Sequence, residues 1–141
     1  MYPEMMIAPM REELTRLGIA EARTAEQVEQ AVKQPGTTMI VVNSVCGCAA
    51  GKMRPGVAMA LANETRPDRV VTVFAGQDRD ATDKARQYFT GFAPSSPSIG
   101  ILRDGALVYM MQRSDIEVRP AAAIAQELAR AFNTHCAKQP V

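Results

Sequence analysis

The sequence predicts an α/β fold in which helices flank a central, mixed, four-stranded sheet. Apolar, β-branched runs alternate with helical patterns from residue 37 onward, and Asp104-Gly105 separates two further apolar runs. Strands that alternate with helices pair in parallel, whereas a two-residue turn requires antiparallel pairing. The 141 residues are about the length of one domain. We therefore expect a single domain over 1–141, with an N-terminal helical extension over 1–36 and a core over 37–134.

Two helices are expected in the N-terminal extension. Apolar residues at helical spacing predict a helix over about residues 4–17, which Gly18 would end. The expected buried face of this helix carries Met6, Met10, Leu14 and Leu17. Thr24 and Gln27 match a capping box, in which each side chain satisfies an exposed backbone N–H of the other. A second helix is therefore expected over about 25–34.

The core begins with an almost continuous apolar segment, TTMIVVN, at residues 37–43. Such a segment is typical of a strand that is buried on both faces. A long helix should follow from about Cys48, and Pro55 should kink it because proline lacks a backbone N–H. The remaining expected elements are a strand over 69–75, a helix over 80–90, a hairpin over 98–111 and a helix over 120–133.

This order of elements is the thioredoxin-like arrangement: a βαβ unit, a connecting helix, a β-hairpin and a terminal helix. In such folds the reactive cysteines lie where the first core strand meets its helix, and Cys46 and Cys48 occupy that junction in VVNSVCGCAAGKMRP. Unpaired N–H groups at a helix start stabilise a thiolate, which is the attacking species. We expect Cys46 to be the exposed nucleophile and Cys48 to be the inward-facing resolving thiol.

Two further features support this site. Gly47 provides the backbone freedom that a disulfide between Cys46 and Cys48 would need, and such a strained bond should be relatively oxidising. Pro97 in PSSPS is expected to follow a cis peptide bond opposite the cysteine loop. The backbone of Ser96 would then pair with an extended substrate segment. The alternative for Pro97 is an ordinary loop proline.

Composition limits the partners and the compartment. The 16 basic and 15 acidic residues nearly cancel, which argues against nucleic acid as a partner. Apolar runs are much shorter than the roughly 20 residues of a membrane span, and the N-terminus does not resemble a signal peptide. We expect a cytoplasmic protein without a membrane partner. In that reducing compartment, a close cysteine pair suggests redox or metal chemistry rather than a structural disulfide.

Several stretches together resemble the bacilliredoxin family of bacterial thioredoxin-like proteins: VVNSVCGCAAGKMRP, TVFAGQDRDAT, YFTGFAPSSPS and AFNTHC. The resemblance runs from about residue 4 to Cys136. It implies removal of low-molecular-weight thiol caps, especially bacillithiol, from protein cysteines through a mixed disulfide on Cys46, with weak disulfide isomerase activity. Implied partners are S-thiolated or disulfide-containing proteins, with bacillithiol or a similar thiol as co-substrate and no tightly bound cofactor. The tail AKQPV and Ser114, where the family commonly has histidine, depart from the pattern.

Two other functions compete with this interpretation. Cys46, Cys48, His135 and Cys136 contain the donors of a Cys₃His zinc site, and paired thiolates also suit copper(I). However, His135 and Cys136 are adjacent at a helix end, which makes tetrahedral ligation awkward, so no metal site is expected. The other alternative is a redox-inactive thioredoxin-like binding module with inert, buried cysteines.

The residues around the cysteines leave further alternatives open. Lys52 and Arg54 either stabilise the Cys46 thiolate or are solvated charges on a helix face. Asn43 and Ser44 are alternative hydrogen-bond donors near the thiolate. His135 is expected to complement the carbonyl groups at the end of the last helix rather than to act as a base.

Overall fold

The computed structural model describes residues 1–138, which form a mixed five-stranded sheet in the order β1-β3-β2-β4-β5. The strands are β1 (Ala20–Glu21), β2 (Thr37–Asn43), β3 (Arg69–Phe74), β4 (Ser98–Arg103) and β5 (Ala106–Met111). β1, β3 and β2 run parallel, whereas β4 is antiparallel to both β2 and β5. The last three residues of the expected 1–141 domain, in the tail AKQPV, lie outside the described residues.

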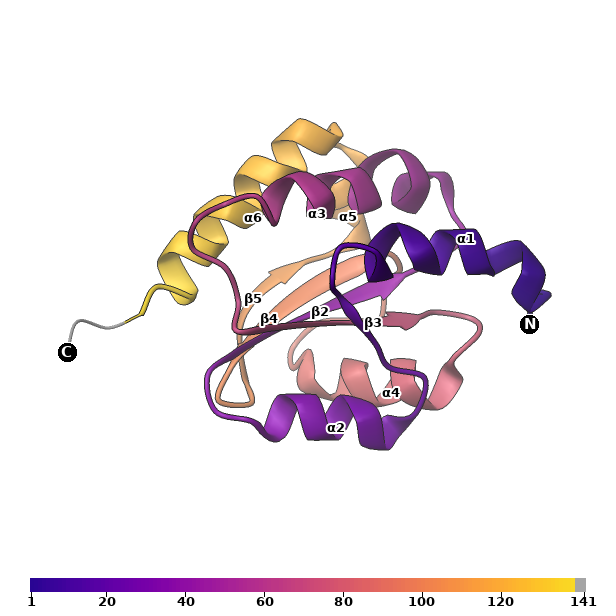
Figure 1. Ribbon diagram of the computed structural model, residues 1–141, viewed down its shortest axis with the longest axis horizontal. Coiled ribbons are helices and arrows are strands. Elements are labelled where there is room, and N and C mark those ends of the chain that lie inside the picture. The colour runs from indigo at the N-terminus through magenta and orange to yellow at the C-terminus, as the bar shows by residue number, and fades with distance from the viewer. Residues whose placement is uncertain (139–141) are drawn as a thin grey trace.

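Helices cover both faces of this sheet. They are α1 (Glu4–Thr15), α2 (Ala25–Lys33), the π-helical turn η1 (Ala49–Met53), α3 (Arg54–Ala60), α4 (Arg79–Tyr88), α5 (Arg113–Glu117) and α6 (Ala121–His135). α2 and α4 pack together on one face, while α1, α3, α5 and α6 lie on the other (Figure 1). The sheet is thus the middle of three layers.

β2 is the centre of the fold because all seven of its residues are buried. It lies between β3 and β4, so its backbone is paired on both edges. Successive side chains of a strand point to opposite faces. Met39 and Val41 accordingly join the core beneath α3 and α6, whereas Ile40 and Val42 join the core beneath α2 and α4. The nearly continuous apolar sequence of this strand follows from burial on both faces.

The sheet has five strands rather than the expected four, and the additional strand is β1 at its edge. Ala20 pairs with Val71 and Glu21 with Thr72, so residues 1–36 contribute a strand as well as two helices. β1 is too short to show an alternating pattern, and its extended conformation depends on pairing with β3. Sequence periodicity also missed the five-residue α5.

The first helix buries only Leu14 of the four residues expected to face the core. Its buried residues are Ile7, Arg11 and Leu14, whereas Met6 is exposed. The periodicity was misleading because a charged residue, Arg11, occupies the middle of the buried face. The carboxylates of Glu4 in the same helix and of Asp78 at the start of α4 compensate that charge.

Pro55 does not kink a continuous helix. The segment after the cysteines is divided into η1 and α3, and Pro55 lies in the first turn of α3. A proline is tolerated there because a first-turn N–H has no partner within its helix. The expected hairpin turn is confirmed, since Asp104 and Gly105 have φ values of 50° and 83°, as a type I′ turn requires.

Candidate active site

Cys46 and Cys48 lie between the end of β2 and η1, at the expected junction. The carbonyl oxygen of Cys46 accepts hydrogen bonds from the N–H groups of Ala49 at 3.0 Å and Ala50 at 3.2 Å, which marks the helix start. Both thiols are free. Each is half-buried and packs against the core beneath α3 and α6, so the expected contrast between an exposed Cys46 and a buried Cys48 is not seen.

Ser44 makes a direct contact with Cys46. Its buried hydroxyl donates to Cys46 Sγ at 3.4 Å and accepts the Cys46 N–H at 3.3 Å. Burial raises the pKa of the Cys46 thiol, but hydrogen bonds from Ser44 and from the N–H groups of Ala49 and Cys48, with the charge of Arg113, more than offset it. The net result is a pKa below that of an ordinary cysteine, which favours the nucleophilic thiolate.

The dithiol form does not require glycine at position 47. Its φ lies outside the left-handed region, and a Cβ added there would meet nothing within 4 Å. The expected role of Gly47 in closing a Cys46–Cys48 ring therefore stays a prediction about the disulfide form.

The Ser96–Pro97 peptide bond is cis, as expected. Pro97 is buried, and the next residue, Ser98, pairs with Val42. This register places Pro97 beside the end of β2, where the chain leaves for the cysteines. Ser96 and Pro97, just before β4, therefore lie at the same end of the sheet as Cys46, just after β2.

Arg113 is a neighbour of the site that the sequence did not reveal. Its guanidinium donates to the Ser96 carbonyl oxygen at 3.3 Å, and α5, which it begins, packs against η1. Arg113 is exposed, so its charge is available at the surface beside the thiol. No local spacing relates Arg113 to Cys46, because the packing of α5 against η1 brings them together.

The two basic residues after the cysteines differ in environment. Lys52 is at the surface, where its ammonium group donates to the Glu117 carbonyl oxygen at 2.6 Å. Arg54 is only 3% exposed and pairs with Glu13 of α1 at 3.0 Å. The interpretation of Arg54 as a solvated charge is therefore wrong, because the residue is buried. Its guanidinium also donates to the Ser44 carbonyl oxygen, in the backbone that leads into Cys46.

Cys136 and His135 lie far from this site. Burial raises the pKa of the Cys136 thiol, although a hydrogen bond with Thr37 lowers it. Thr37 begins β2 and Cys46 lies beyond its other end, so the length of the strand, roughly 20 Å, separates the thiols. Among residues 1–138, no three His, Cys, Asp or Glu side chains are placed to hold a metal. The Cys₃His alternative is thus not assembled.

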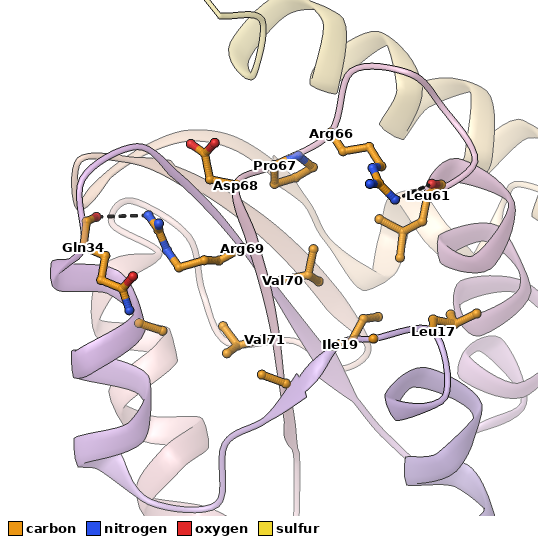
Figure 2. Close-up of a pocket in the computed structure, with 13 residues that line it drawn as sticks. Leu17, Ile19, Gln34, Leu61, Arg66, Pro67, Asp68, Arg69, Val70 and Val71 are labelled. Carbon is orange, nitrogen blue, oxygen red and sulfur yellow. Dashed lines mark hydrogen bonds between the residues drawn. The ribbon is translucent and has the colours of Figure 1, made fainter.

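A pocket of about 500 Å³ lies at the opposite end of the sheet, where β3 begins (Figure 2). Apolar residues including Leu17, Ile19 and Val70 line it. Its two arginines, Arg66 and Arg69, donate to main-chain carbonyl oxygens rather than pointing free groups into the space (Figure 2). None of the expected site residues lines this pocket.

Comparisons with known proteins agree with the fold. The chain is similar to a thioredoxin of Malassezia sympodialis, with a TM-score of 0.60 and 15% identity, covering 84% of this chain and 91% of that one. It is also similar to the oxidised thioredoxin of Plasmodium falciparum, with a TM-score of 0.58 and 12% identity, covering 84% and 99% of the two chains. These likenesses establish a thioredoxin fold.

Sequence relatives identify the family. A family model described as disulphide isomerase matches residues 2–136. A bacilliredoxin of Koribacter versatilis is 64% identical over 137 residues, covering 96% of this chain and 94% of its own. The chain belongs to the bacilliredoxin family. A bacilliredoxin of Geobacillus kaustophilus is 48% identical over 137 residues, with the same coverages of 96% and 94%.

Membership of the bacilliredoxin family and the thioredoxin fold together support a thiol–disulfide oxidoreductase. The free thiols lie at the helix start where this chemistry is favoured. In the described part of the chain, residues 1–138, no helix has the length and apolar character needed to cross a membrane.

Replacement of Ser44 by Ala should raise the pKa of Cys46, because the thiolate loses a hydrogen-bond donor. Alkylation of Cys46 at neutral pH should slow severalfold, and its pH profile should move to higher pH. Peptide mass spectrometry after timed alkylation measures this rate separately from that of Cys136, which should react much more slowly. The exposed Ser114, replaced by Ala, is the control. Equal rates for Cys46 and Cys136 in the unmodified protein would instead favour the redox-inactive binding module.

Proposed function

We propose that this protein removes low-molecular-weight thiol caps, in particular bacillithiol, from oxidised protein cysteines through a mixed disulfide on Cys46. The observation that best supports this is the convergence of the Ser44 hydroxyl and helix-start N–H groups on Cys46 Sγ. These donors favour the thiolate form of Cys46, just beyond the end of β2. The family relatives named bacilliredoxin support the choice of substrate.

The first step is attack by the Cys46 thiolate on the cap sulfur of a protein–cap disulfide. A new bond forms between Cys46 Sγ and the cap sulfur, and the target cysteine leaves as a thiolate. The second step has two routes, and in each the attacking thiol has released its proton to solvent. An outside low-molecular-weight thiolate attacks the cap sulfur, which frees Cys46 as a thiolate and leaves a disulfide between the outside thiol and the cap. Alternatively, the Cys48 thiolate attacks Cys46 Sγ. The Cys48 route releases the cap thiol and leaves a Cys46–Cys48 disulfide, which an external thiol reductant must reduce.

The protein substrates in this proposal are S-thiolated or disulfide-containing chains that bind across the surface beside Cys46. Ser96, which precedes the cis bond to Pro97, would supply backbone groups to an extended substrate segment. Weak disulfide isomerase activity follows from the same exchange when both sulfurs of the substrate disulfide belong to proteins. The proposal places this reaction in the cytoplasm, with no tightly bound cofactor.

The test is to offer a bacillithiol-capped target protein to Cys48→Ala. Without the neighbouring thiol, the cap should remain on Cys46 as a stable mixed disulfide, and the target should recover its free cysteine. Intact mass and peptide mapping locate the cap. Cys136→Ala is the matched control and should behave as the unmodified protein. Retention of the cap by the target, or its transfer to a residue other than Cys46, would refute the proposal.

A further inference from the structure

Arg54 is a buried charge that contacts both the N-terminal helix and the segment before the cysteines. Its Nε donates to Glu13 of α1 at 3.0 Å. Its Nη1 donates to Asn43 Oδ1 at 2.9 Å and to the Ser44 carbonyl oxygen at 3.0 Å. A guanidinium that is only 3% exposed carries a large desolvation cost unless such partners are in place.

Asn43 completes this connection. Its amide Nδ2 donates to the Met10 carbonyl oxygen of α1 at 3.1 Å, and its Oδ1 accepts the Ser44 N–H at 2.9 Å. Ser44 is thus held at both its N–H and its carbonyl group by residues that also contact α1. The Ser44 side chain has three staggered χ1 rotamers. Fixing the Ser44 backbone restricts which of them brings the hydroxyl to Cys46 Sγ.

We propose that Arg54 and Glu13 are positioning residues, which hold Ser44 so that its hydroxyl donates to Cys46, and that the N-terminal helix thereby sets the reactivity of this thiol. The inference rests on the proposed role of Cys46 as the attacking thiol. Arg54 acts through Ser44, since the hydrogen bonds it makes in this segment are to Asn43 and the Ser44 backbone. The helix α1 is therefore part of the apparatus that prepares the thiolate, as well as a cover for the sheet.

Other groups around Cys46 must be kept constant in a test. Arg113 of α5 lowers the pKa of this thiol by its charge, after the larger contributions of burial and hydrogen bonds. Lys52 is held on the Glu117 carbonyl oxygen, and Cys48 supplies an N–H group to the thiolate. Substitutions at Arg54 and Glu13 leave all three residues unchanged.

The experiment measures alkylation of Cys46 against pH in Arg54→Gln and Glu13→Gln. Arg54→Gln should slow alkylation at neutral pH severalfold and move the pH profile upward. Glu13→Gln should act in the same direction but less strongly, because Arg54 keeps its bonds to Asn43 and Ser44. The exposed neighbour Glu12, replaced by Gln, is the control and should leave the profile unchanged. An unshifted profile in a folded Arg54→Gln protein would overturn the inference.

The route through Ser44 is tested by a double-mutant cycle. In a Ser44→Ala background, Arg54→Gln should have no further effect on alkylation, because the donor that it positions is absent. A full additional effect would mean that Arg54 acts directly by its charge, contrary to the proposal. If circular dichroism shows that Arg54→Gln is unfolded, Glu13→Gln takes its place in the cycle. Alkylation uses no capped target, so failed cap removal with the expected alkylation pattern would reject the proposed function but not this inference.

Discussion

Cys46→Ser should reduce thiol–disulfide exchange to the uncatalysed rate with every disulfide substrate. The serine hydroxyl does not ionise at neutral pH and cannot form the mixed disulfide, although the surrounding donors remain in place. Cys48→Ser should retain transfer of a cap to the protein but lose formation of the internal disulfide. Acid-quenched time courses with a capped protein and with a protein disulfide as substrate measure cap removal and protein disulfide exchange separately.

The comparison of the two variants assigns the roles of the thiols. Cys136→Ser serves as the control, because Cys136 is buried beside Thr37 at the other end of β2. Exchange activity that survives in Cys46→Ser but disappears in Cys48→Ser would reverse the assignment. In the unmodified protein the exchange rate should fall as pH decreases through the lowered pKa of Cys46, since protonation removes the thiolate.

Arg11→Met should lower the free energy of unfolding by about 3 kcal/mol, because it leaves buried carboxylate charge without its partner. Arg11 is 4% exposed, and its guanidinium donates to Glu4 at 2.7 Å and to Asp78 at 2.7 and 3.0 Å. It also lies over the Phe74 ring, 5.3 Å from the centroid. Burial lowers the pKa of Arg11, but hydrogen bonds with Asp78 and Glu4 raise it above its usual value, so it stays charged.

Denaturant unfolding followed by circular dichroism measures this loss. Arg16→Met is the control on the same helix, because Arg16 is exposed, and its effect should remain within about 0.5 kcal/mol. A loss from Arg11→Met as small as that of the control would mean that the ion pair between Arg11 and Asp78 does not hold α1 against the start of α4.

Elements with a strong local pattern were predictable from the sequence. β2 spans the predicted residues 37–43, and the Asp104-Gly105 turn has the predicted backbone conformation. β1 and α5 were missed because a two-residue strand and a five-residue helix are too short for periodicity to appear. β1 in particular owes its extended conformation to β3, which lies about 50 residues later in the chain.

The candidate site likewise contains features that the sequence predicted and contacts that it did not. The positions of Cys46 and Cys48 and the cis bond before Pro97 followed from motif and element order. The contacts of Arg54 and Arg113 did not, because each depends on residues that are distant in sequence. A charged residue at a helical position is usually solvated, and nothing adjacent to Arg54 indicates that Glu13 will meet it.

The sequence by itself determined the order of the core elements, the central strand and the helix start that carries the two thiols. These depend on hydrophobic pattern, turn chemistry and neighbouring residues, which act over a few positions in the chain. Only the tertiary structure decided which charges are buried and which donors reach Cys46. That choice depends on how α1 and α5 pack beside the end of β2, where burial makes each unpaired charge costly and so selects its partner.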